Sequence, residues 1–203
     1  AVIDIGTISL RMVIAQVEHD GTVQVLDRLQ QAVSVGRDTF TTSQISRETT
    51  EECVRVLSSY RTVMQEYGIT ERNQIRVVAT TAVREARNRV AFMDRILIAT
   101  GLEVEPLEEI DVIRLTYLGL YSQVVRDKEL SRGSVLVAAM EGGSTDLIFL
   151  ENGQVTLSRN YRLGSLKLQK MLETFQAPAS HERGLMEDHI KQTVAVIRSN
   201  VGN

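Results

Sequence analysis

The chain contains no tryptophan, and aromatic residues of all kinds make up only 4% of its 203 residues. Proteins that bind single-stranded nucleic acids usually stack the bases on aromatic side chains, so this scarcity argues against that function. The net charge of −3 also argues against a general nucleic-acid binder, because such proteins are usually basic.

Cysteine is equally scarce, since Cys53 is the only one. It cannot form an internal disulfide, and it lies on the apolar face of a predicted helix. We interpret it as a core thiol in a reducing cytoplasm and not as a nucleophile. The three histidines do not cluster and indicate no metal site, and no serine-histidine-aspartate order with a nucleophile elbow is present.

Long apolar runs are missing as well. No stretch reaches the length that a bilayer-spanning helix needs, and no basic-apolar leader is present. We therefore expect a cytoplasmic protein without membrane or nucleic-acid partners, and a homodimer as its candidate assembly. The chain opens inside a strand without a methionine and stops directly after a helix, so we also expect a fragment of a longer protein.

What is present is an ordinary globular composition, with 43% hydrophobic and 24% charged residues, and an internal repeat. The first copy consists of a buried strand, a small polar loop at residues 6–9 and a hairpin closed by a preferred turn dipeptide. The second copy repeats this order, with its loop at residues 141–144. Loops of this kind let backbone N–H groups converge on phosphate.

The remaining periodicities predict an α/β protein in which strands and helices alternate. Residues 36–46 are polar and are predicted to form a loop, after which Ser46 caps a long helix. Residues 127–133 are charged and rich in turn formers, which predicts a domain boundary with domains at residues 1–126 and 127–203.

Candidate phosphate ligands follow the first strand. Asp4 ends this strand, at the edge where open α/β sheets bind ligands, and is predicted to hold a metal ion or its water. Thr7 and Ser9 supply hydroxyls and Arg11 supplies a guanidinium, so we predict that all three bind phosphate. Arg84 begins a helix behind another buried strand and is a candidate phosphate clamp. The alternatives are a turn-capping role for Asp4, a solvated strand position for Arg11, and an exposed helix position paired with a nearby glutamate for Arg84.

The second loop repeats the first in length but differs in its chemistry. Ala139 stands where the first copy has Asp4, and Glu141 stands where it has Gly6. The small residues that follow are predicted to bind phosphate: Gly142, Gly143, Ser144 and Thr145.

Five segments, in order and at suitable spacing, resemble the Ppx/GppA family of exopolyphosphatases and guanosine pentaphosphate phosphohydrolases, which have the actin-like ATPase fold. The resemblance covers nearly the whole chain. The segments are residues 1–11 (family pattern D-x-G-S-N-S-x-R), 78–88 (V-A-T-S-A-x-R-E-A-x-N), 114–119 (R-L-x-Y-x-G), 141–147 (G-G-G-S-T-E-L), and Ser158 with Leu163-Gly164.

The resemblance implies an actin-like, ribonuclease H-like first domain with a mixed sheet, and a partial second domain of the same type. It also implies hydrolysis of the terminal phosphoanhydride of polyphosphate or guanosine pentaphosphate with Mg²⁺, in a cleft between the domains. Asp4 would then hold the metal. The phosphate side would be lined by Thr7, Ser9, Arg11 and Arg84, opposite the second loop.

Several positions depart from the family pattern. The position of the general-base glutamate is Val112, which cannot accept a proton. Ala139 replaces an aspartate of the second domain, and Glu141 replaces the first glycine of the loop. The loop glutamate is shortened to Asp146, which, with Asp4, is a remaining candidate catalytic residue.

These departures predict a family member with impaired catalysis. The alternative is a non-catalytic regulatory or interaction protein that binds phosphate or a nucleotide with the same fold. A third interpretation, an actin-like sugar or acetate kinase, is disfavoured because nothing after Gly133 resembles an adenosine pocket.

Overall fold

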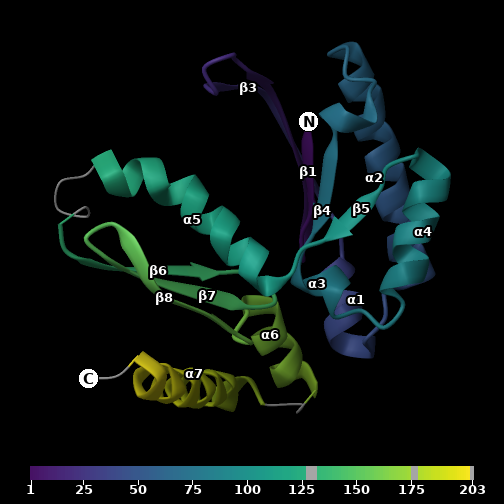
Figure 1. Cartoon of the computed structure of the whole chain (residues 1–203). Helices are drawn as coiled ribbons and strands as arrows, with labels where there is room; N and C mark the ends of the chain where they lie inside the picture. Colours follow the sequence, from purple (N-terminus) through teal and green to yellow (C-terminus); the bar gives the residue numbers. More distant parts are fainter. Residues whose placement is uncertain (127–131, 175–177, 202–203) are drawn as a thin grey trace. The chain divides into compact units, whose positions relative to one another are not determined.

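The computed structural model describes residues 1–126, 132–174 and 178–201. The chain forms two compact units, Ala1–Glu108 and Glu109–Asn203, each with its own sheet (Figure 1). The sequence predicts a boundary after residue 126, and residues 127–131 of the predicted linker lie outside the described residues. The units divide before helix α5 (Glu109–Arg126), because this helix packs against the sheet of the second unit.

The first unit is built around a five-stranded sheet in the order β3-β2-β1-β4-β5. Strands β2 and β3 form an antiparallel hairpin beside β1, whereas β4 and β5 run parallel to β1. This mixed sheet confirms the predicted fold class. The strands are β1 (Val2–Ile5), β2 (Ser9–Val17), β3 (Val23–Ala32), β4 (Arg76–Ala79) and β5 (Val104–Pro106).

Two long helices, α2 and α4, pack side by side in the first unit (Figure 1). The Ser46 hydroxyl accepts a hydrogen bond of 3.1 Å from the Thr49 N–H and begins α2, as predicted. Gly101, at φ +71°, ends α4 in the left-handed conformation that glycine favours. The helices are α1 (Val35–Thr42), α2 (Arg47–Glu66), η1 (Arg72–Gln74), α3 (Thr81–Arg84) and α4 (Arg89–Thr100).

Helix α1 corrects the predicted loop over residues 36–46. Its buried residues, Val35, Gly36 and Thr39, recur at helical spacing, while the other positions face solvent at least in part. Only one of the three is a large apolar residue, so the sequence lacks the hydrophobic period that would reveal the helix. The helix brings the Gly36 N–H to the Thr7 carbonyl of the first loop.

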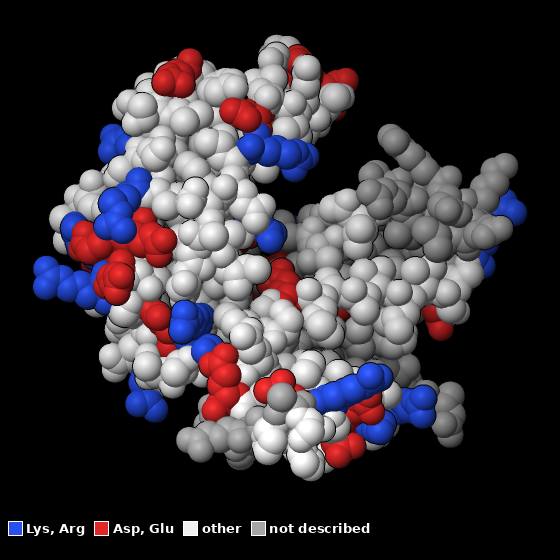
Figure 2. Space-filling view, turned by 180° about the vertical axis from the view of Figure 1, so that it is seen from behind, with Lys and Arg blue, Asp and Glu red and all other residues white. Residues whose placement is uncertain are grey.

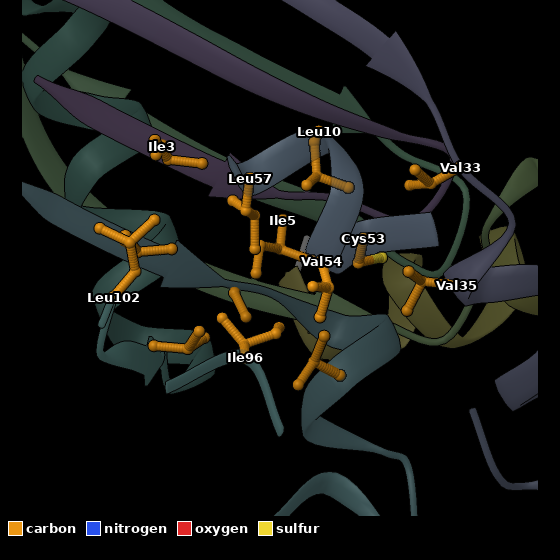
Figure 3. Packing of buried hydrophobic residues seen from close by; sticks show 14 of the residues in the cluster. Ile3, Ile5, Leu10, Val33, Val35, Cys53, Val54, Leu57, Ile96 and Leu102 are labelled. Atoms are coloured by element: carbon orange, nitrogen blue, oxygen red, sulfur yellow. The ribbon is translucent and has the colours of Figure 1, made fainter. Parts of the chain in front are cut away.

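Apolar side chains from the sheet and from α2 and α4 interlock in the core of the first unit (Figure 3). Ile3, Ile5 and Leu10 of the sheet and Leu57 of α2 have no solvent exposure. Cys53 lies among them, and burial raises the pKa of its thiol to about 12. The thiol therefore stays protonated at neutral pH, as expected of a core residue.

The second unit contains an antiparallel sheet in the order β6-β7-β8. Helix α5 lies along one face of this sheet (Figure 1), where Ile113 packs against Ile148 and Leu150. The Tyr117 hydroxyl donates a hydrogen bond of 3.1 Å to the Gly153 carbonyl in the β7-β8 turn. The elements besides α5 are β6 (Ser134–Met140), β7 (Thr145–Glu151), β8 (Gln154–Tyr161), α6 (Ser165–Thr174) and α7 (Ala179–Val201).

The internal repeat is present in the fold, since β1-β2-β3-α1 and β6-β7-β8-α6 have the same order and pairing. The two repeats differ at their first strands, β1 and β6, on the edge that does not pair with the second strand of the repeat. That edge of β1 pairs with β4, whereas no strand in the described ranges pairs with that edge of β6. Leu136 and Met140, on one face of β6, are 55% and 56% exposed.

The surface drawn in Figure 2 carries lysine and arginine side chains interspersed with aspartate and glutamate. Mixed charge of this kind does not form the single-sign patch that general nucleic-acid binders use. Within residues 1–126, 132–174 and 178–201, no helix combines the length and the apolar character required to cross a membrane.

Candidate functional site

The first loop, residues 6–9, is shaped by main-chain hydrogen bonds. The Gly6 N–H donates to the Ser9 carbonyl at 3.0 Å and closes the loop. The Gly36 N–H of α1 donates to the Thr7 carbonyl at 2.7 Å, and the Val33 N–H donates to the Ile8 carbonyl at 3.0 Å. The loop carbonyls are thus bonded on the α1 side, which suits a loop that offers N–H groups to an anion.

A cluster of buried polar atoms lies on this loop and on the elements that contact it, and none of these atoms hydrogen-bonds to another group in the described part of the chain. Thr80 belongs to it because its N–H reaches the Ile5 carbonyl at 3.4 Å, at the carboxyl end of β1. Buried polar groups are normally paired, so such a cluster indicates a place for water or a ligand. The atoms are Asp4 Oδ1, Thr7 Oγ1, Ser9 Oγ, Thr39 Oγ1 and Thr80 Oγ1.

Asp4 and Arg11 face each other across the β1-β2 pair, so their side chains share one face of the sheet. Burial raises the pKa of the Asp4 carboxyl above its usual value of 3.8, and the positive charge of Arg11 opposes this shift. The structure therefore brings together Asp4, Thr7, Ser9 and Arg11, four of the residues predicted from the sequence.

Arg84 lies in the same unit but has structural partners. Its Nη1 donates to the Leu107 carbonyl at 2.7 Å, and its Nη2 lies 3.4 Å from the Thr81 hydroxyl. These bonds tie the segment after β5 to α3. Its phosphate-clamp role stays a prediction.

The second loop, residues 141–144, repeats the hydrogen bonds of the first. The Glu141 N–H donates to the Ser144 carbonyl at 2.8 Å, as Gly6 does to Ser9. The Leu166 and Lys167 N–H groups of α6 donate to the Gly142 carbonyl at 3.0 and 3.1 Å, as Gly36 of α1 does to Thr7. The two loops therefore share one pattern of main-chain hydrogen bonds, although their side chains differ.

Gly164 allows this second loop to pack against the start of α6. A Cβ atom at Gly164 would lie 2.4 Å from both the Gly142 carbonyl oxygen and the Gly143 carbonyl carbon. Both atoms belong to the main chain and cannot move aside as a flexible side chain can. The Thr145 hydroxyl adds a hydrogen bond to the Leu163 carbonyl in the same contact.

The altered family positions of the second unit differ in exposure. Val112 on α5 and Ala139 on β6 are half-buried, and Glu141 is exposed. Asp146 is buried, with 3% exposure, and its Oδ1 accepts a hydrogen bond of 2.6 Å from Asn160 Nδ2. The catalytic role of Asp146 and the phosphate-binding role of residues 142–145 stay predictions.

Among the described residues, no group of three or more histidine, cysteine, aspartate or glutamate side chains is arranged to hold a metal. Mg²⁺ needs less than this, because it usually binds one or two carboxylates and completes its shell with water and substrate phosphates. Asp4 fits that requirement, because its buried Oδ1 has no hydrogen-bond partner among the residues that the structure describes.

Three polar residues near the loops were not among the residues predicted from the sequence to form the site. Thr39 lies on α1, a helix that the sequence pattern does not predict. Thr80 could have been included, since it directly follows β4 at the carboxyl edge of the sheet. Asn160 gives no sequence signal, because its contact with Asp146 depends on the pairing register of β7 and β8.

Comparison with known proteins gives a family match over most of the chain. Residues 12–202 match the model of the Ppx/GppA phosphatase family. A crystal structure of the Aquifex aeolicus Ppx/GppA family member is 26% identical, with a TM-score of 0.71, and the match covers 97% of this chain and 61% of that one.

Two further relatives differ in identity and length. An exopolyphosphatase from Cytophaga hutchinsonii is 20% identical, with a TM-score of 0.83, over 98% of this chain and 62% of that one, which supports the fold alone. A bifunctional 3-dehydroquinate synthase/phosphatase from Fusobacterium nucleatum is 26% identical over 172 residues, which are 83% of this chain and 25% of that protein. The chain thus spans less than two thirds of each relative.

Proposed function

Since the chain belongs to the Ppx/GppA phosphatase family, we propose that its first loop binds the terminal phosphate of polyphosphate or guanosine pentaphosphate, with Mg²⁺. The cluster of buried polar atoms around residues 6–9 carries this proposal. Each buried group without a partner costs about 1–3 kcal/mol, so unpaired groups on and beside this loop, among the residues that the structure describes, suit a ligand site.

The residue types in the cluster suit condensed phosphate. Hydroxyls of Thr7 and Ser9 and loop N–H groups donate hydrogen bonds to phosphate oxygens, and Arg11 adds positive charge. Asp4 is negative and would repel phosphate by itself, so it is the residue that would hold the cation. When bound, Mg²⁺ supplies Lewis-acid stabilisation of the developing charge on the phosphate.

We expect hydrolysis to be slow. Val112 provides no general base, and a missing base typically lowers a rate about 10²- to 10⁴-fold. Ala139 provides no second carboxylate beside Asp146. These same replacements favour the second candidate function, a non-catalytic regulatory or interaction protein that binds phosphate or a nucleotide. Phosphate release from tripolyphosphate separates the two functions, because only the first predicts Mg²⁺-dependent turnover.

Asp4→Asn is expected to abolish Mg²⁺-dependent binding of tripolyphosphate and to raise stability at neutral pH by about 1 kcal/mol. Burial raises the pKa of Asp4, so its contribution to stability is present below the unfolded value and is lost as the pH rises through the folded value. At neutral pH the ionised carboxyl is therefore a cost, which asparagine removes. Titration calorimetry and urea unfolding at pH 4 and pH 7.5 measure both effects.

Asp20→Asn is the matched control. Asp20 lies in an exposed hairpin turn, where the Thr22 N–H holds the pKa of its carboxyl below the usual value. Its charge therefore favours the folded state at neutral pH, and its removal should neither stabilise the protein nor change tripolyphosphate binding. Unchanged binding in Asp4→Asn would show that the first loop is not the phosphate site.

A further inference from the structure

One face of the first sheet carries a line of polar side chains that leads away from the first loop. Ser9 and Arg11 are two residues apart on β2, so their side chains point to the same face, about 7 Å apart along the strand. Val13 is the next β2 residue on that face, and it pairs directly with Arg28 of β3. The side chain of Arg28 is therefore the diagonal neighbour of Arg11, within reach of a long side chain. All four residues belong to the first unit.

The acidic residue beside Arg28 in the sequence points to the opposite face. Asp27 pairs with Ile14, whose side chain lies in the core. The Asp27 Oδ2 accepts a hydrogen bond of 3.2 Å from the hydroxyl of Tyr67, directly after α2. Its Oδ1 accepts a bond of 2.7 Å from the Arg28 N–H. The Asp27 carboxylate is thus held on the helix side of the sheet, away from the Arg28 guanidinium.

The positive charge of Arg28 is not neutralised locally. In the described part of the chain, no carboxylate forms an ion pair with this exposed side chain. Arg11, its diagonal neighbour, is also exposed and lies opposite Asp4. Like charges at neighbouring positions of a sheet repel each other, and an anion bound between them would remove this cost.

We propose that Arg28, beside Arg11, forms a second phosphate subsite, which binds the part of a linear polyphosphate chain that follows its terminal phosphate. The inference rests on the proposed function, because the chain would begin at the first loop and continue along this face of the sheet. Guanidinium groups bind phosphate oxygens with two parallel N–H donors. Val13 and Gln30, the residues paired with Arg28 and Arg11, offer no aromatic ring for a guanine base, which favours polyphosphate over guanosine pentaphosphate.

The test compares Arg28→Gln with Arg55→Gln. Both substitutions remove one positive charge, but Arg55 is an exposed residue of α2, which packs against the other face of the sheet. Calorimetry with Mg²⁺ measures the affinity for long-chain polyphosphate and for pyrophosphate. We expect Arg28→Gln to reduce the preference for the long chain over pyrophosphate about 10-fold, as loss of one charged hydrogen-bonding group does. Arg55→Gln should keep the preference of the wild type.

A second variant tests the same face by addition. Gln30 is exposed and pairs directly with Arg11, so Gln30→Arg places another guanidinium in the proposed subsite. This variant should increase the preference for the long chain. An unchanged preference in both Arg28→Gln and Gln30→Arg overturns the inference and leaves Arg28 as a charge that protects the edge strand β3 from pairing with other chains.

The remaining outcomes separate the inference from the proposed function. Equal losses in Arg28→Gln and Arg55→Gln overturn the inference, because net charge alone would then explain the preference. If the wild type binds neither polyphosphate nor pyrophosphate, the proposed function fails, and the inference fails with it. If the wild type binds both, Asp4→Asn binds neither, and Arg28→Gln matches the wild type, only the inference is wrong.

Discussion

The double variant Val112→Glu/Ala139→Asp is expected to release phosphate from tripolyphosphate about 10²- to 10⁴-fold faster than the wild type, with Mg²⁺ present. Glutamate at position 112 supplies a side chain that can accept a proton from the attacking water. Half-burial of Val112 also favours this role, because partial desolvation raises the pKa of a carboxyl toward neutral pH. Initial rates of phosphate release measure the effect.

The restored acid should lower stability as it raises activity. Aspartate at position 139 stands directly opposite Asp146 in the sheet, and like charges in directly paired positions repel each other. We expect the double variant to melt at a lower temperature than the wild type in a chelator, and to regain stability when Mg²⁺ is added, because a ligand that binds only the folded state stabilises it.

Val112→Gln/Ala139→Asn is the matched control, since these amides have nearly the same shapes but neither accept a proton nor carry charge. It should release phosphate no faster than the wild type. A wild type that is already as fast as the double variant would refute the expectation of impaired catalysis. A double variant as slow as the control would show that position 112 is not the place of the base.

Gly164→Ala is expected to destabilise the second unit by about 3 kcal/mol, at the upper end of the cost of overpacking. The added methyl group would lie 2.4 Å from main-chain atoms of Gly142 and Gly143, so the loop must move away from α6. The hydrogen bonds from Leu166 and Lys167 to the Gly142 carbonyl would then lengthen. Urea unfolding measures the change in free energy.

Gly184→Ala provides the opposite expectation in the same unit. Gly184 lies within α7, where a Cβ atom would meet no other atom within 4 Å. Alanine is a better helix former than glycine, so this variant should be more stable by about 0.5–1 kcal/mol. If Gly164→Ala and Gly184→Ala unfold alike, the loop is not packed against α6 as tightly as the structure shows.

The parts of the fold predicted correctly are those with strong local signals. Ser46 marks the start of α2, and the sequence predicts it because a capping role depends on a few neighbouring residues. Helix α1 was missed because its buried face contains Gly36 and Thr39, which do not contribute to a hydrophobic period.

The candidate site also contains residues that the sequence predicts and contacts that it does not. Asp4, Thr7, Ser9 and Arg11 could be grouped from the sequence, because they follow one another around a single turn and β-pairing brings them together. The neighbours of Asp146 could not be found in this way. Its contact with Asn160 depends on which residues of β7 and β8 pair, and the register of the β7-β8 pair shifts at Phe149 and Leu150.

The shared hydrogen-bond pattern of the two loops has an evolutionary consequence. In each loop the bonds that fix the path join N–H and C=O groups, which every residue except proline possesses. Mutations that replace side chains in one copy therefore leave its shape intact, provided that Gly164 is kept beside the second loop. The side chains of the second loop can therefore change its ligand chemistry while the main chain keeps the same path.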